Sequence, residues 1–189
     1  MQLYGTVTPD APLLVVALEL EAVALRATGL PLLVTGAGKV NAAIAVSHVL
    51  ASAAPREVIN LGTAGGLHAH TEGTHVVAQV IEHDLDDATI HALAGVHCSR
   101  PIQLQTGGLI LATGDRFIAR DEERETLAVI ADLVDMEGYA IAKAAANAGV
   151  PVRLVKHVSD RADESAAMSW TDTVTQCSYA LADWLRAHV

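Results

Sequence analysis

The sequence predicts a single α/β domain over residues 1–189, with a largely parallel sheet between layers of helices. Apolar runs of strand length alternate with helix-like stretches along almost the whole chain, and no linker or internal repeat interrupts them. Hydrophobic residues make up 51% of the chain and charged residues 18%. A chain of this length and composition buries enough apolar surface to form one sizeable core.

The strand candidates are short aliphatic runs. They cover residues 13–18, 32–35, 57–61, 74–81, 109–113, 133–136 and 152–158. The last of these shows little alternation of polar and apolar residues, as expected for a strand that is buried on both faces. A glycine-rich segment at 62–66 follows the third run and is interpreted either as a tight turn or as backbone that approaches a ligand closely.

The helix candidates cover residues 19–28, 39–53, 120–131, 137–148 and 169–187. Pro55 follows the second candidate, and acidic residues occupy the first turn of the third, where the helix dipole favours them. The last candidate carries an apolar stripe that we interpret as core packing. The members of this stripe are Trp170, Val174, Cys177, Leu181 and Trp184.

Charge and composition exclude several classes of function. The formal net charge is -10 and no run of Lys or Arg is present, which argues against nucleic acid or an anionic membrane as a partner. Two distant cysteines form no disulfide framework, and no apolar run reaches the roughly 20 residues of a membrane-spanning helix. We therefore expect a soluble, cytoplasmic protein.

Acidic and small polar residues follow several strand candidates, at the edge where open α/β sheets bind ligands. These residues are Glu19, Glu21, Gly62, Thr63, Gly65, Asp135, Met136, Glu137, Ser159 and Asp160. The glycine segment lacks the spacing of a dinucleotide or nucleoside-triphosphate loop. The histidines at 68, 70 and 75 lack the partners of a zinc motif, so we expect no metal and no cofactor.

Six segments, in this order and spacing, carry a resemblance over nearly the whole chain. They are Ala-Leu-Glu-Leu-Glu at 17–21, Thr-Gly-Ala-Gly-Lys-Val-Asn-Ala-Ala at 35–43, Asn-Leu-Gly-Thr-Ala-Gly-Gly-Leu at 60–67, Thr-Gly-Asp-Arg-Phe-Ile at 113–118, Asp-Met-Glu-Gly-Tyr-Ala at 135–140 and Val-Ser-Asp-Arg-Ala-Asp at 158–163. The chain resembles the purine nucleoside phosphorylase and nucleosidase superfamily, most closely its 5'-methylthioadenosine/S-adenosylhomocysteine nucleosidases. This implies a three-layer α/β/α sandwich with a mixed, largely parallel central sheet.

The resemblance also implies three acidic roles in breaking an N-glycosidic bond. Asp160 would protonate N7 of the purine, with Ser159 beside it. Glu137 would hydrogen-bond the ribose hydroxyls, and Glu21 would position the attacking water. One acid on each side of the bond suits this chemistry, because the leaving base gains electrons while the sugar becomes cationic. We expect partial burial and nearby acids to raise the pKa of Asp160.

The remaining implied site residues contact the substrate. Phe117 would stack on the base and the backbone of Ile118 would meet the base edge. Met136 would lie against the sugar, and Thr63 and Gly65 would line the ribose and water side. An Asp at position 160 suits a 6-aminopurine, because its carboxyl group can meet both N7 and the exocyclic amine. The resembling nucleosidases further imply a homodimer.

Two other functions are considered beside an adenine-nucleoside hydrolase. A phosphorylase would hold phosphate with arginines, one of them at the position of Asn60, and the glutamates here would repel that anion. A catalytically silent relative that binds purine nucleosides has no need of Glu21. The chain departs from the family pattern at Lys156, where Arg is usual, and in residues 84–93, which lack the aromatics that wall the pocket for the 5' substituent. The 5' substituent therefore stays open.

Overall fold

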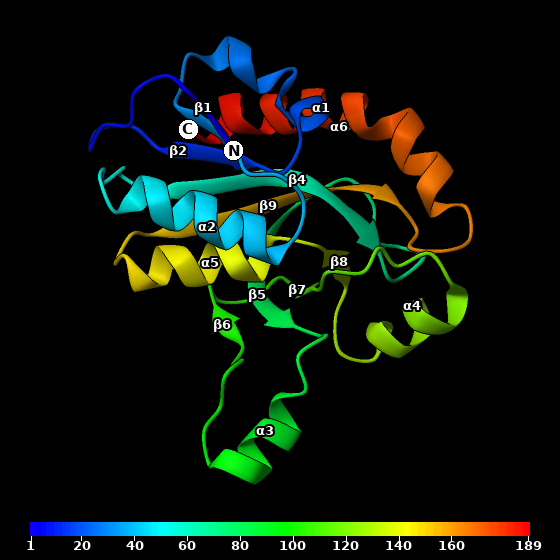
Figure 1. The fold of residues 1–189 in the computed structure, drawn as a ribbon. Coiled ribbons are helices and arrows are strands. Elements are labelled where there is room, and N and C mark those ends of the chain that lie inside the picture. Colours follow the sequence, from blue (N-terminus) through cyan, green and yellow to red (C-terminus); the bar gives the residue numbers. More distant parts are fainter.

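The computed structural model describes residues 1–189, which form one nine-stranded mixed sheet with helices on both faces (Figure 1). The strands are β1 (Gln2–Tyr4), β2 (Leu13–Val16), β3 (Leu32–Val34), β4 (Val58–Gly66), β5 (Thr74–Glu82), β6 (Ile102–Gln103), β7 (Leu109–Thr113), β8 (Leu133–Asp135) and β9 (Val152–Asp160). The predicted α/β architecture with a mixed sheet is confirmed.

The sheet order is β1-β3-β2-β4-β8-β7-β5-β6, and β9 pairs with both β4 and β5. The strands β4, β9, β5, β7 and β8 therefore close into a ring. Parallel ladders join β2 to β3 and β4, β4 to β9, and β7 to β5 and β8. The ring brings the ends of β4, β8 and β9 together, since Gly65 pairs with Val134 on one side and with Asp160 on the other.

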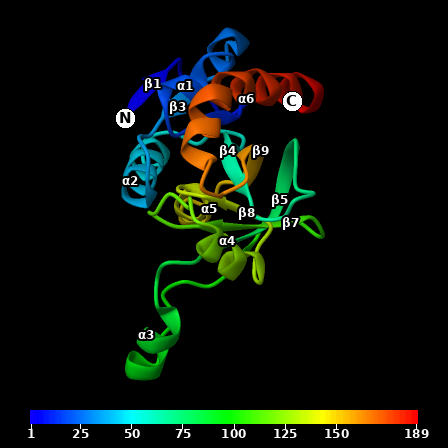
Figure 2. The same ribbon diagram turned by 90° about the vertical axis from the view of Figure 1, so that its right-hand side faces the viewer.

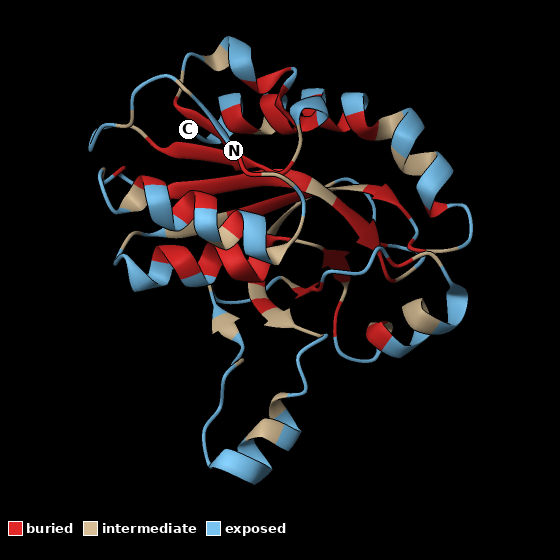
Figure 3. Cartoon of the chain, in the orientation of Figure 1, coloured by how far each residue is buried: buried red, intermediate tan, exposed pale blue.

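Two helical layers cover the sheet. The helices are α1 (Glu19–Ala22), the 3-10 helix η1 (Leu25–Thr28), α2 (Lys39–Leu50), α3 (Asp87–Ala94), α4 (Asp121–Ala128), α5 (Gly138–Asn147) and α6 (Ala166–His188). One face packs against α2 and α5, and the other against α1, η1 and α6 (Figure 1). Burial is concentrated in the strands and in the helix faces turned towards them (Figure 3).

Two sequence-based expectations about these elements are wrong. The glycine segment at 62–66 is not a turn but the second half of β4, because β9 pairs with this strand from Val58 to Gly65. The predicted helix 19–28 is split into α1 and η1. The Ser178 hydroxyl group donates to the Glu21 carbonyl and accepts from the Ala24 N–H, which removes two backbone groups from a continuous helix.

The strands β1 and β6 and the helix α3 lie at the periphery, and the sequence did not predict them. Helix α3 projects away from the body and contains no buried residue (Figures 1 and 2). Its side chains include Leu93, which is 84% exposed. None of the helices combines the length and the apolar character needed to cross a lipid bilayer.

Candidate active site

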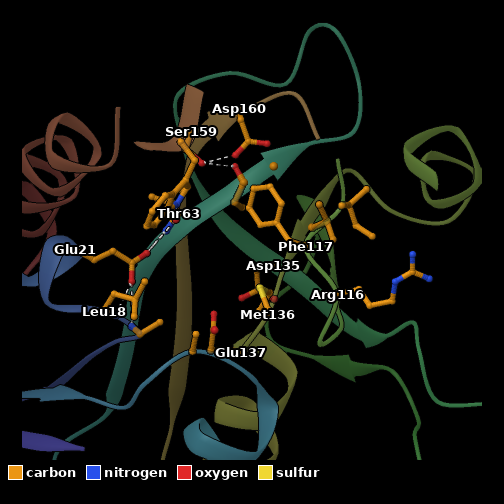
Figure 4. Close-up of a pocket in the computed structure, with 17 residues that line it drawn as sticks. Leu18, Glu21, Thr63, Arg116, Phe117, Asp135, Met136, Glu137, Ser159 and Asp160 are labelled. Atoms are coloured by element: carbon orange, nitrogen blue, oxygen red, sulfur yellow. Dashed lines mark hydrogen bonds between the residues drawn. The ribbon is translucent and has the colours of Figure 1, made fainter. Parts of the chain in front are cut away.

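A pocket of about 210 Å³ lies where β2, β4, β8 and β9 end, and α6 and the loop after β7 complete its wall. All nine residues to which the resemblance assigns a role line it, namely Glu21, Thr63, Gly65, Phe117, Ile118, Met136, Glu137, Ser159 and Asp160. Figure 4 shows Asp160 and Ser159 at one end and Glu137 and Met136 at the other. Glu19 lies outside the pocket, at the surface, where it pairs with Arg26 and Tyr4.

The Glu21 carboxylate is held by four donors. Its Oε2 accepts from the backbone N–H groups of Ala17 and Leu18, both at 3.1 Å. Its Oε1 accepts from the Thr63 N–H at 2.9 Å and from the Thr63 hydroxyl at 3.0 Å. The side chain is only 4% exposed. These contacts join the end of β2 to the middle of β4 and leave the carboxylate one orientation at the pocket wall.

Glu137 belongs to a buried cluster of charged groups at the end of the pocket away from Asp160 (Figure 4). Its Oε1 accepts from the Gly38 N–H at 2.7 Å. Next to it in the cluster, Asp135 Oδ2 lies 2.8 Å from Lys156 Nζ, and Asp135 Oδ1 accepts from the Thr113 hydroxyl at 2.6 Å. Lys156 is 1% exposed. The Lys156 ammonium group therefore interacts electrostatically with more than one buried carboxyl group, Asp135 and Glu137 among them.

The electrostatics of this cluster shift two pKa values. Burial, with the nearby Asp135 carboxylate, raises the pKa of Glu137 to about 8, against the opposing influence of Lys156. Burial alone would lower the pKa of Lys156, but Asp135 and Glu137 outweigh it, so that this pKa is raised. The cluster therefore keeps the lysine charged and favours a protonated Glu137 when no cationic group is in the pocket.

Asp160 stands in a different environment. Its Oδ2 accepts from the Ser159 hydroxyl at 2.8 Å, and its Oδ1 accepts from the Ala162 N–H at 2.8 Å. Ala162 has a φ of +51°, a left-handed conformation that non-glycine residues rarely adopt. Burial raises the pKa of Asp160 despite these two donors, and Asp163 adds to the rise. The predicted direction of this shift is confirmed.

The glycines of β4 make room for the charged groups. A Cβ at Gly62 would lie 3.2 Å from Lys156 Nζ and 3.4 Å from Glu21 Oε1. A Cβ at Gly65 would lie 3.1 Å from Asp160 Oδ1. Gly65 therefore sits beside Asp160, while Thr63 contacts Glu21. Backbone does approach functional groups closely here, within a strand rather than a turn.

Phe117 and Ile118 come from the loop between β7 and α4. Phe117 is 44% exposed, and its ring lies across the pocket from Glu21 (Figure 4). The loop is fixed by Asp115, whose Oδ1 accepts from the Lys39 N–H at 2.7 Å and whose own N–H donates to Asp84 at 2.8 Å. The aromatic ring thus depends on contacts from the start of α2 and the end of β5.

Sequence reasoning misplaced one residue of the site. Trp170 was assigned to the core stripe of the last helix, but it lines the pocket and its Nε1–H donates to the Thr63 hydroxyl oxygen at 3.0 Å. Val174, Cys177 and Leu181 of that stripe are buried as expected. Trp170 lies near the start of α6, beside the pocket, and a helical period alone does not indicate this.

The arrangement suits a reaction in which one part of a substrate gains a proton and another part becomes cationic. Asp160 can supply a proton at one end. Glu21 and Glu137 line the rest of the pocket, where carboxylates stabilise developing positive charge. No group of three or more His, Cys, Asp or Glu side chains is placed to hold a metal ion.

The chain matches the phosphorylase superfamily over residues 26–101 and 80–188. It is 30% identical to a 5'-methylthioadenosine/S-adenosylhomocysteine nucleosidase of Marinomonas sp. (strain MWYL1), over 75% of this chain and 72% of the relative. It is 25% identical to an aminodeoxyfutalosine nucleosidase of Helicobacter pylori, over 80% of this chain and 76% of that protein.

Solved structures show the same fold. A 5'-methylthioadenosine/S-adenosylhomocysteine nucleosidase of Helicobacter pylori, crystallised with butyl-thio-DADMe-Immucillin-A, aligns with a TM-score of 0.83. The alignment covers 94% of this chain and 97% of that one, at 20% sequence identity. The mixed sheet and its helical layers are therefore shared over almost the full length of both chains.

Proposed function

The chain belongs to the phosphorylase superfamily and is an N-glycosyl hydrolase of its nucleosidase branch, and we propose that it cleaves adenine nucleosides of the 5'-methylthioadenosine/S-adenosylhomocysteine type. The products would be adenine and the free ribose derivative. The observation that carries this proposal is that Asp160 lies at one end of a single pocket whose other walls hold Glu21 and Glu137.

The residues of the pocket divide the chemistry between them. Asp160 gives its proton to N7, so that adenine leaves as a neutral molecule. Glu21 positions the attacking water and takes its proton as the new C–O bond forms. Glu137 hydrogen-bonds the ribose hydroxyls, and its carboxyl group ionises more readily once the cationic sugar lies beside it.

Aromatic and apolar side chains hold the substrate. Phe117 stacks on the purine, and Ile118, which is buried, supports the base through its backbone. Met136 lies against the sugar. Ser159 keeps Asp160 in place through its hydroxyl group. These contacts orient the glycosidic bond between the proton donor and the water.

Water is favoured over phosphate as the nucleophile. Asn60 stands where the resemblance places an arginine, and its Nδ2 donates to the Val15 carbonyl at 3.1 Å. Lys156, the buried cation of the cluster, is already paired with Asp135 at 2.8 Å. Arg116, which also lines the pocket, is paired with Glu123. A phosphate dianion would therefore meet Glu21 and Glu137 without an unpaired cation to offset the cost of removing it from water.

Adenine release tests the proposal. The purified chain is incubated with methylthioadenosine, S-adenosylhomocysteine, 5'-deoxyadenosine and inosine, each with and without phosphate. We expect adenine without phosphate, and a fall in kcat of about 10² or more in Asp160→Asn, the scale of lost general-acid catalysis. Asp172→Asn, which removes an exposed acid of α6 outside the pocket, is the matched control. Strictly phosphate-dependent turnover would show a phosphorylase, and adenine release by Asp160→Asn at the wild-type rate would refute the role of Asp160.

We further propose that the active form is a homodimer in the cytoplasm. Its partners would be small nucleosides, and it would bind neither nucleic acid nor membranes. Exposed apolar side chains on α2, Val40 and Ile44, and on α3, Leu93, support a protein interface. Two free thiols fit a reducing compartment, and the net charge of -10 disfavours polyanions. Light scattering on the purified chain should give twice the monomer mass, and Ile44→Glu should halve it.

A further inference from the structure

Helix α6 reaches both sides of the pocket through polar side chains. Near its start, the Trp170 indole N–H donates to Thr63 Oγ1 at 3.0 Å. One turn later, Thr173 Oγ1 lies 3.1 Å from the carbonyl oxygen of Ser159. Further along, Ser178 Oγ donates to the carbonyl oxygen of Glu21 at 2.7 Å. One helix therefore contacts the backbone or the partner of both proposed catalytic acids.

The Trp170 contact determines which way the Thr63 hydroxyl points. A hydroxyl group has one proton and two lone pairs. The indole N–H has no acceptor capacity, so it occupies a lone pair of Thr63 Oγ1 and leaves the hydroxyl proton free to donate elsewhere. Glu21 Oε1 lies 3.0 Å from that oxygen and accepts this proton. The hydrogen bonds therefore run in one direction, from Trp170 through Thr63 to Glu21.

We propose that Trp170 is a positioning residue for the nucleophilic water, acting on Glu21 through the Thr63 hydroxyl group. This inference rests on the proposed hydrolase function. With the indole N–H in place, the hydroxyl group cannot turn away from Glu21 without losing a hydrogen bond. The Glu21 carboxylate then keeps the orientation in which it lines the pocket and can contact the water that attacks the sugar. Without the indole N–H, this restraint on the hydroxyl group is lost and Glu21 is held less tightly.

The test is a double-mutant cycle between Trp170 and Thr63. Trp170→Phe keeps an aromatic ring against the pocket and removes only the N–H donor. We expect kcat to fall about 3- to 10-fold, the scale of one net hydrogen bond, with KM changed less than kcat. In the Thr63→Val background the same substitution should change kcat by less than about 1.5-fold, because the relay is already broken.

Trp184→Phe is the matched control. This second tryptophan lies on the same helix, where it stacks on His188 with ring centroids 4.5 Å apart, outside the pocket. Its replacement should leave kcat and KM unchanged. If Trp170→Phe lowers kcat equally in the wild-type and Thr63→Val backgrounds, Trp170 acts by packing alone and the proposal is overturned.

A second measurement does not depend on activity. The two indole N–H groups of 15N-labelled protein give separate NMR signals, assigned by the two Trp→Phe variants. Thr63→Val should shift the Trp170 signal and speed its hydrogen exchange, while the Trp184 signal stays in place. An unmoved Trp170 signal would overturn the relay. A wild-type chain that releases no adenine would instead refute the proposed function, and the NMR signal would still decide whether the hydrogen bond exists.

Discussion

Replacing Glu137 with Gln should change how the stability of the empty protein depends on pH. Burial and the Asp135 carboxylate raise the pKa of Glu137 from 4.5 to about 8 in the folded protein. The folded state thus holds this proton more tightly than the unfolded chain does. The resulting stabilisation is complete below about pH 4.5 and is lost as the pH rises through about 8. Gln is neutral at every pH and retains the acceptor for the Gly38 N–H.

The pKa shift sets the size of the effect. A shift of one pKa unit corresponds to about 1.4 kcal/mol, so a rise of about 3.5 units sets a ceiling of about 5 kcal/mol. Glu137 borders the pocket and feels the charge of Lys156, so water and relaxation of the cluster reduce this value. We expect the stability of Glu137→Gln relative to wild type to rise by about 2 kcal/mol between pH 5 and pH 9.

Urea denaturation at pH 5, 6, 7, 8 and 9, followed by circular dichroism without ligand, measures this difference. Glu164→Gln is the control, because Glu164 is exposed and its substitution should leave the profile parallel to wild type. Parallel profiles for Glu137→Gln and wild type would refute the argument that this carboxyl group carries a strongly raised pKa. The same variant should also lose adenine release, since Gln cannot ionise beside a cationic sugar.

Three further substitutions probe the rest of the site. Lys156→Met leaves Asp135 without its buried partner and should destabilise the protein by about 3–5 kcal/mol in the same urea assay, a result that an unchanged midpoint would contradict. Gly65→Ala places a Cβ 3.1 Å from Asp160 Oδ1 and should cost about 1–3 kcal/mol of stability together with most of the kcat, whereas full activity would show that Asp160 moves freely. Phe117→Ala should raise KM about tenfold, because stacking on a base contributes about 1–3 kcal/mol, and an unchanged KM would place the purine elsewhere.

Much of the site could be predicted because its residues follow strand ends. Glu21 follows β2 and Asp160 ends β9, and both strands run parallel to β4, so their ends lie at one edge of the sheet. Glu137 follows β8, which pairs antiparallel with the end of β4. The aliphatic runs fix the strands closely, and the strand 109–113 matches β7 in full. The order of the six sequence segments supplied the roles, which geometry at a strand end does not define.

The remainder depends on contacts that are distant in sequence. The glycines of β4 have the local signature of a turn, and only the long ladder with β9 keeps them extended. Trp170 shares the helical period of buried neighbours, yet it lies near the start of α6 and lines the pocket. The Lys156–Asp135 pair joins β9 to β8, and neither residue reveals its partner locally. Helix α3 has no buried face from which to predict it.

The start of α2 links the two halves of the pocket. Two successive backbone N–H groups point in different directions, from Gly38 to Glu137 at 2.7 Å and from Lys39 to Asp115 at 2.7 Å. One turn therefore sets both the acid proposed for the sugar and the loop that presents the aromatic ring. Gly38 has a φ of +92°, and a Cβ there would lie 3.1 Å from Asp115 Oδ1. Since a side chain at this position would strain the backbone and displace the loop, the distance between the sugar and base ends of the pocket depends on a residue that need not touch the substrate.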